Sequence, residues 1–180
     1  MVFVMRSQEK WLVSEETGLP FSHCVGCRLP LLEIDAPWLV NKDFHRGECV
    51  LEYAVCQPCR DSVSARLSEE SKAAVRGFLE REIDWEARLA EFMAMPGLAG
   101  RFDHCIACGM PRGEMGGYGI SALFDSGGHL VVGPLPLLIC RSCIGRMTSL
   151  LTAKDRGVWK QFLGEHFSGP PDESEFPGLL

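Results

Sequence analysis

The sequence predicts an α+β fold made of two small duplicated units, each with a cysteine-bearing turn, a β-hairpin and additional packed helices. Three observations predict it. Eight of the nine cysteines lie in four C-x2-C pairs, two similar segments recur about 80 residues apart, and apolar spacing in each segment changes from strand-like to helical. With 180 residues and 46% hydrophobic side chains, the chain is long enough for two small domains and too apolar to be mostly disordered.

The paired cysteines indicate two metal sites. No secretory leader is evident, so we expect a reducing, cytoplasmic location, where disulfides are rare and two cysteines two residues apart direct both sulfurs at one ion. Grouping by proximity places Cys24, Cys27, Cys56 and Cys59 in a first set and Cys105, Cys108, Cys140 and Cys143 in a second. Four thiolates suit Zn²⁺ and leave no position for water, so we expect two structural Zn²⁺ ions. Iron of the rubredoxin type remains an alternative.

The chain is an internal duplication. Residues 21–30 match residues 102–111 identically at five positions, and a second match runs without a gap from Cys56 on Cys140 to Leu79 on Leu163. Two independent matches in the same order indicate a repeated unit. We therefore expect a first zinc-binding unit with a long helix over residues 1–96, a second unit over 97–168 and a disordered tail over 169–180.

A hairpin is predicted between the cysteine pairs of each unit. In the first, apolar segments 38–40 and 49–55 flank a reversal over 41–48 that is rich in Asn, Asp and Gly. In the second, strand 118–124 and the turn 125–128 precede a returning segment, 129–139. Pro134 and Pro136 remove backbone donors from that segment, so it should be irregular or lie at a sheet edge.

Helices are predicted after the second cysteine pair of each unit. Short helices should cover 59–67 and 143–151, and Ser68 and Thr152 should be the N-caps of the helices that follow. Apolar residues at helical spacing then predict one helix from about Glu69 to Met93 and another ending near His166.

This order of cysteine knuckle, β-hairpin and helix resembles the treble-clef group of zinc fingers, over residues 24–67 and 105–151. The resemblance implies that the eight paired cysteines are zinc ligands and that the units are small zinc-stabilised domains. The group includes ribosomal proteins, nucleases and protein-binding modules, so the resemblance implies no particular function.

Other candidate residues lie near the cysteines. His23 and His104 each precede the first cysteine of a unit, and we expect them to support the turn or a thiolate rather than bind the ion. Asp103 and His104 offer nuclease-like groups, but they lie on the knuckle and not on a hairpin strand, which disfavours a nuclease. Cys49 is unpaired and is expected to be a buried, inert strand residue.

The charge disfavours nucleic-acid binding. The formal charge is −6, and two four-thiolate zinc centres would lower it to about −10.

The leading hypothesis is a non-enzymatic, zinc-stabilised scaffold that binds a protein and does not enter a membrane. One alternative is a nucleic-acid-associated zinc finger, whose basic patch could include Arg60, Arg66, Arg141 and Arg146. A metal-dependent nuclease or redox enzyme is a less favoured alternative. Candidate partner-binding residues in the tail are Phe176, Leu179 and Leu180.

Overall fold

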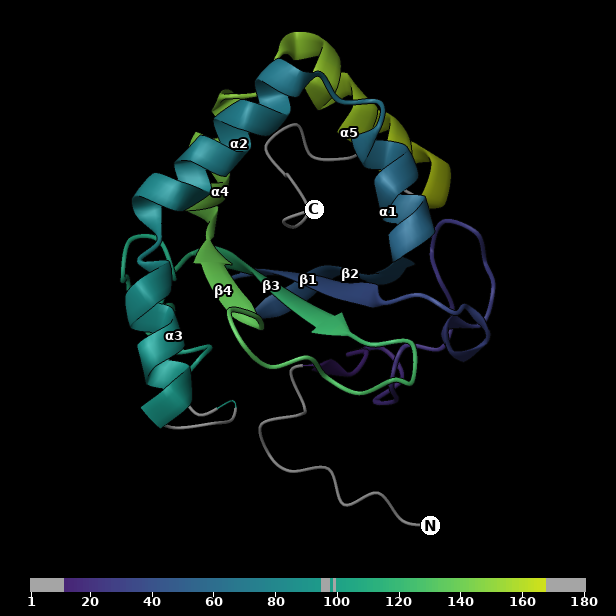
Figure 1. The fold of residues 1–180 in the computed structure, drawn as a ribbon, viewed down its shortest axis with the longest axis horizontal. Helices are drawn as coiled ribbons and strands as arrows, with labels where there is room; N and C mark the ends of the chain where they lie inside the picture. The colour runs from purple at the N-terminus through teal and green to yellow at the C-terminus, as the bar shows by residue number, and fades with distance from the viewer. Residues whose placement is uncertain (1–11, 95–97, 99, 168–180) are drawn as a thin grey trace.

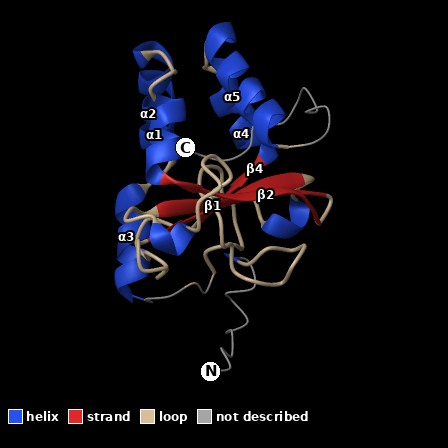
Figure 2. Cartoon of the chain, turned by 90° about the vertical axis from the view of Figure 1, so that its right-hand side faces the viewer, coloured by secondary structure: helices blue, strands red, loops and turns tan. Residues whose placement is uncertain are grey.

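A four-stranded antiparallel sheet of order β2-β1-β3-β4 supports four helices on one face (Figures 1 and 2). The computed structural model describes residues 12–94, 98 and 100–167. Within these residues there are five α-helices, and none is both long and apolar enough to cross a lipid bilayer. The α+β prediction is confirmed. The tail residues Phe176, Leu179 and Leu180 lie outside the described residues.

The first hairpin joins β1 (Trp38–His45) to β2 (Glu48–Cys56) through a two-residue turn. Arg46 and Gly47 have φ of 50° and 85°, as in the type I′ turn that matches strand twist. The predicted reversal over 41–48 is therefore wrong in extent, because residues 41–45 belong to β1. Asn41 is only 2% exposed and pairs with Ser121 of β3, so pairing between the units overrides the weak strand propensity of Asn.

The second hairpin is irregular, as predicted. Strand β3 (Gly117–Phe124) pairs with the short edge strand β4 (Leu137–Cys140), and Pro134 and Pro136 lie in the loop that precedes β4. The guanidinium of Arg88 donates to the carbonyl of Pro136 at 2.7 Å, and that of Arg101 donates to the carbonyl of Gly133 at 2.5 Å. These side chains hold the loop without a strand ladder.

Both predicted short helices form, but they begin two residues before the expected starts at 59 and 143 and end at 64 and 149. Helices α1 (Gln57–Ser64) and α4 (Arg141–Ser149) start directly after Cys56 and Cys140, and α5 spans Ala153–His166. The hydroxyl of Ser68 accepts from the amide of Ser71 at the start of α2 (Glu69–Glu82), and Thr152 does the same for α5. Both predicted N-caps are confirmed.

The single helix expected from Glu69 to Met93 is wrong, because the chain forms α2 and then a separate helix α3 (Trp85–Ala94). Ile83 is extended, with φ −112° and ψ 124°, and its side chain is buried. Asp84 then accepts from the amide of Ala87 at 2.8 Å and starts a new helix. Burying Ile83 and capping at Asp84 outweigh continuation of the helical ladder.

The long helix of each unit packs on the other unit. In Figure 1, α2 and α4 lie along one arm of an arch above the sheet, and α1 and α5 lie along the other. Phe78 of α2 packs in a cluster with Ile139, Cys140 and Ile144 of the second unit. The first unit's Tyr53, Val55 and Cys56 pack instead with apolar residues of the second unit: Leu151, Val158, Trp159, Phe162 and Leu163. The core around each four-cysteine cluster therefore contains a helix from the opposite half of the chain.

Equivalent residues of the two units meet between the strands and between the helices. Asn41 and Ser121 pair directly across β1 and β3, and the Ser121 hydroxyl donates to Asn41 Oδ1 at 2.7 Å. Asn41 pairs with Tyr53 in the first hairpin, and Ser121 pairs with Leu137 in the second. Because the duplication aligns Tyr53 with Leu137, Asn41 and Ser121 are equivalent residues. Ser71 and Asp155, the third residues of α2 and α5, also contact each other. The two halves are thus related by an approximate two-fold axis.

The opposite face of the sheet is covered by the first described residues and by residues near 100. Leu12, Leu98 and Phe102 pack there on Phe44 and Ile120. Lys42 is fully buried on this face, where its Nζ donates to the carbonyl of Val13 at 2.7 Å and pairs with Glu15 at 2.6 Å. The amine is therefore fully partnered although it lies in the core.

Candidate metal centres and an adjoining cleft

The structure brings the eight paired cysteines into the two sets that sequence proximity predicted. In each set the four sulfurs lie within 4.8 Å of one another. Sulfur separations include 3.5 Å for Cys24 and Cys56, and 3.7 Å for Cys108 and Cys140. A tetrahedral ion with metal–sulfur bonds of about 2.3 Å requires edges of about 3.8 Å. Each cluster could therefore hold one metal ion.

Backbone hydrogen bonds shape the turn that presents the first pair of each cluster. The amide of Arg28 donates to the carbonyl of Cys24 at 2.9 Å, and that of Gly109 donates to the carbonyl of Cys105 at the same distance. The second pair starts a helix, and the amide of Cys56 donates to the sulfur of Cys24 at 3.3 Å. The second unit repeats this bond from Cys140 to Cys105 at 3.2 Å. Amide donors of this kind stabilise thiolate charge.

The two turns differ at one backbone position, and the difference predicts a stabilising substitution. Arg28 has φ of 64°, where its equivalent Gly109 has 72°. A side chain in this left-handed region costs about 1–2 kcal/mol, part of which the greater freedom of glycine in the unfolded chain offsets. We expect Arg28→Gly to raise the free energy of unfolding by up to about 1 kcal/mol in denaturant titrations.

The reverse change is the control. Gly109→Ala should lower the free energy of unfolding by about 1 kcal/mol or more, because it places a Cβ in the same conformation. An unchanged or lower stability for Arg28→Gly would show that the arginine side chain contributes more than its backbone strain removes.

The two histidines lie beside the clusters and outside the sulfur sets. His23 and His104 are both exposed and form isolated bridges with Pro30 and Pro111 across their turns. The Ser22 hydroxyl lies 2.8 Å from Nδ1 of His23. These positions are those of turn residues, and their support of a thiolate stays a prediction.

The four arginines considered for nucleic-acid binding are divided between two arms and have neighbours within the chain. Arg66, just after α1, bonds to Gln161, and Arg60 of α1 lies 3.8 Å from Asp61. On α4, Arg146 pairs with Glu82 at 2.8 Å, and Arg141 bonds to His45. They do not form one continuous patch.

Cys49 is a half-buried residue of β2. Its sulfur lies 3.5 Å from the carbonyl of Leu51, and burial raises the pKa of the thiol to about 12. The thiol is therefore protonated at neutral pH, in agreement with the expected low reactivity.

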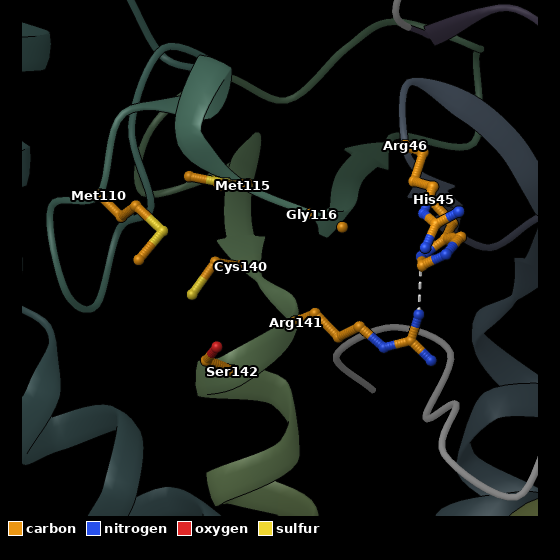
Figure 3. Close-up of a pocket in the computed structure, with 9 residues that line it drawn as sticks. His45, Arg46, Met110, Met115, Gly116, Cys140, Arg141 and Ser142 are labelled. Atoms are coloured by element: carbon orange, nitrogen blue, oxygen red, sulfur yellow. Dashed lines mark hydrogen bonds between the residues drawn. The ribbon is translucent and has the colours of Figure 1, made fainter.

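Sequence analysis missed a cleft of about 520 Å³ beside the second cluster (Figure 3). His45 and Arg46 come from the turn of the first hairpin, whereas Arg141 and Ser142 come from the start of α4. Only the pairing of β1 with β3 brings these residues together. The one available signal was the basic pair at the first hairpin turn, which had no evident neighbour in the sequence.

Comparison of the chain with protein-family models, with curated proteins and with solved structures gives no match. The functional argument therefore depends on the chemistry of the two clusters and of the surfaces around them.

Proposed function

We propose that the protein is a non-enzymatic zinc protein whose two treble-clef-like units form a rigid scaffold for a protein partner. The observation that carries the proposal is the closed four-sulfur geometry of both clusters. Zn²⁺ bound by four thiolates has no open position for water or substrate, so its role is to hold the fold. The knuckle, hairpin and helix of each unit support the treble-clef likeness.

The exposed apolar side chains support a protein as partner. Leu29 and Leu32 are 55% and 70% exposed beside the first knuckle, and Leu89 and Met93 are 50% and 71% exposed, one turn apart on α3. Large apolar side chains that lie together on a surface are typical of interaction sites. The acidic formal charge of −6 disfavours a polyanion.

The function is tested by affinity capture with metal-loaded protein under native conditions. We expect a stoichiometric protein complex that survives high salt and that Leu89→Ser with Met93→Ser, or Leu29→Ser with Leu32→Ser, weakens at least tenfold. Arg60→Gln in α1 with Arg66→Gln, two residues after the end of that helix, is the matched control.

Two results would overturn the proposal. Recovery of RNA or DNA whose binding is lost when Arg60, Arg66, Arg141 and Arg146 are neutralised would favour the nucleic-acid alternative. Elemental analysis that finds fewer than about two ions per chain, or a C-x2-C pair that oxidises readily in the metal-loaded protein, would favour a redox enzyme.

A further inference from the structure

We propose that the cleft between the first hairpin turn and the start of α4 binds a small ligand through a phosphate group. This site is independent of the proposed scaffold function. The argument rests on the charge of the cleft, on the geometry of two of its side chains and on comparison with the equivalent place in the first unit.

The cleft concentrates hydrogen-bond donors in an acidic protein. Arg46, Arg141, His45 and Ser142 line it, together with Cys140 of the second cluster, and none of the described residues that line it is a carboxylate. The formal charge of the chain is −6, so this local excess of positive charge is not a property of the surface as a whole. Two guanidinium groups provide the forked donors that match phosphate oxygens.

Arg141 sets the state of the His45 ring. Its NH1 lies 2.9 Å from Nδ1 of His45 (Figure 3). A guanidinium always donates, so Nδ1 accepts and the ring carries its hydrogen on Nε2. The contact thus orients the imidazole, and it fixes Arg141 across the cleft.

The floor of the cleft is glycine for a steric reason. A Cβ on Gly117 would lie 3.0 Å from the carbonyl oxygen of Phe44 and 3.4 Å from Cδ of Arg141. The amide of Arg46 donates to the carbonyl of Gly116 at 2.9 Å and holds the turn beside this floor. Glycine at position 117 therefore allows β3 to approach β1 and the Arg141 side chain, whereas a Cβ on Gly116 would meet no atom within 4 Å.

The duplication supplies an internal comparison. Beside the first cluster, the strand pairing places Asp125 at the position equivalent to His45. The alignment of the cysteines places Gln57 and Pro58 at the positions equivalent to Arg141 and Ser142. The first unit forms the same four-sulfur cluster without these donors. Neither the fold nor the cluster therefore requires a basic cleft.

Compensation of thiolate charge does not account for Arg141 either. Arg146 pairs with Glu82, and its guanidinium also interacts electrostatically with Cys143 of the second cluster, which helps to raise the pKa of Arg146. Arg141 points instead towards His45 across the cleft (Figure 3).

The rest of the cleft indicates what carries the phosphate. Its volume of about 520 Å³ exceeds what one phosphate fills, and Met110 and Met115 line the side away from the hairpin turn (Figure 3). Methionine side chains adapt to flat apolar groups. A phosphate monoester with an apolar or aromatic remainder, such as a nucleoside monophosphate, fits this division. Free phosphate is the other source of the same chemistry.

Calorimetric titration of the metal-loaded full chain with inorganic phosphate, adenosine monophosphate and adenosine tests the site. We expect both phosphate compounds to bind and adenosine to bind at least tenfold more weakly than its monophosphate. A higher affinity for adenosine monophosphate than for inorganic phosphate would indicate that the methionine side of the cleft contacts the adenine base. Equal affinities would indicate that the site binds free phosphate.

Variants of the cleft residues locate the binding. Arg141→Gln with His45→Asp, which copies the equivalent place beside the first cluster, should weaken phosphate binding at least tenfold. Arg46→Asn should weaken it severalfold without touching the packed core. Arg60→Gln with Arg66→Gln is the control and should bind normally. Metal content and circular dichroism identify any variant that fails to fold. If the Arg141 and His45 double variant fails to fold, Arg46→Asn still tests the site, because Arg46 lies at an exposed turn position.

The proposal would be overturned if neither phosphate compound bound at millimolar concentration. Binding that the Arg46 and Arg141 variants left unchanged, or binding of single-stranded RNA without binding of either small phosphate, would also exclude it.

Discussion

Replacing Cys143 by Ser is expected to destabilise the whole chain and not only the second unit. A structural zinc site contributes about 10–16 kcal/mol of binding energy, whereas the net stability of a protein is about 5–15 kcal/mol. Weakening one site by about 5 kcal/mol therefore removes a large part of the total. The loss of stability should extend to both units, because α2 packs beside the second cluster and α5 beside the first, so that each cluster contacts a helix of the other half. We call this arrangement the helix exchange.

Trp38 and Trp159 belong to the core around the first cluster, whereas Trp85 packs against the second. Trp38 and Trp159 provide the measurement in a background in which Trp11 and Trp85 are replaced by Phe. In Cys143→Ser, we expect their fluorescence and the far-ultraviolet circular dichroism to change together in one thermal transition at a much lower temperature. Metal analysis should show reduced content at both sites. Cys49→Ser is the matched control and should alter the melting temperature little, because this thiol is half-buried and outside the sulfur sets.

Independent halves would behave differently. If Cys143→Ser kept one ion and native tryptophan fluorescence while only part of the helix signal melted, the helix exchange would contribute no coupling between the clusters. Such a result would make the two units separate folding domains in energetic terms.

The local parts of the fold could be predicted from the sequence because their signals are local. The spacing of Cys24, Cys27, Cys56 and Cys59 defines a ligand set without any knowledge of the surrounding fold. Ser68 and Thr152 act as caps through the amides of residues only three positions away. Pro134 and Pro136 exclude a regular strand wherever the segment lies.

The arrangement of the two units could not be predicted, because an apolar stripe does not specify its partner. Phe78 and Phe162 occupy equivalent positions on α2 and α5, and their spacing would be the same if each packed on its own unit. Likewise, Asn41 reads as a turn residue until its pairing with Ser121 is known. The basic cleft depends on the same pairing. The arrangement is the one expected if a dimer with exchanged helices were joined into one chain.

Replacing Asp155 by Ala is expected to weaken the contact at which the two exchanged helices start. Asp155 is fully buried, and its carboxylate accepts from the amide of Ser68 at 3.2 Å and from the hydroxyls of Ser68 and Ser71 at 2.5 Å each. The hydroxyl of Thr152 donates to the same carboxylate at 2.8 Å. In return, Ser71 accepts from the amide of Thr152 at 3.1 Å. The third residue of each helix thus caps the start of the other helix.

We expect Asp155→Ala to lower the melting temperature at least twice as much as Ser68→Ala. Loss of the Ser68 cap should cost about 1 kcal/mol, because it removes one acceptor at one helix start. Asp155→Ala leaves the amide of the N-cap residue Ser68 and three hydroxyls without their shared acceptor. Asp155→Asn keeps the shape and one acceptor oxygen, so its effect should lie between the two. Equal losses in Asp155→Ala and Ser68→Ala would contradict a shared cap.

The pH dependence separates the charge of Asp155 from its shape. Hydrogen bonds from Ser68 and Ser71 hold the pKa of this carboxyl well below its usual range. A lowered pKa in the folded state stabilises the protein above the unfolded pKa of about 3.9, and the contribution is lost as the pH falls through the folded pKa. The difference in melting temperature between the native chain and Asp155→Asn should therefore be constant above about pH 5 and shrink below about pH 4. Acid release of the metals acts on both proteins, so only this difference reports on Asp155. A difference that stayed constant to the lowest pH at which both proteins fold would show that the carboxylate acts as a neutral acceptor.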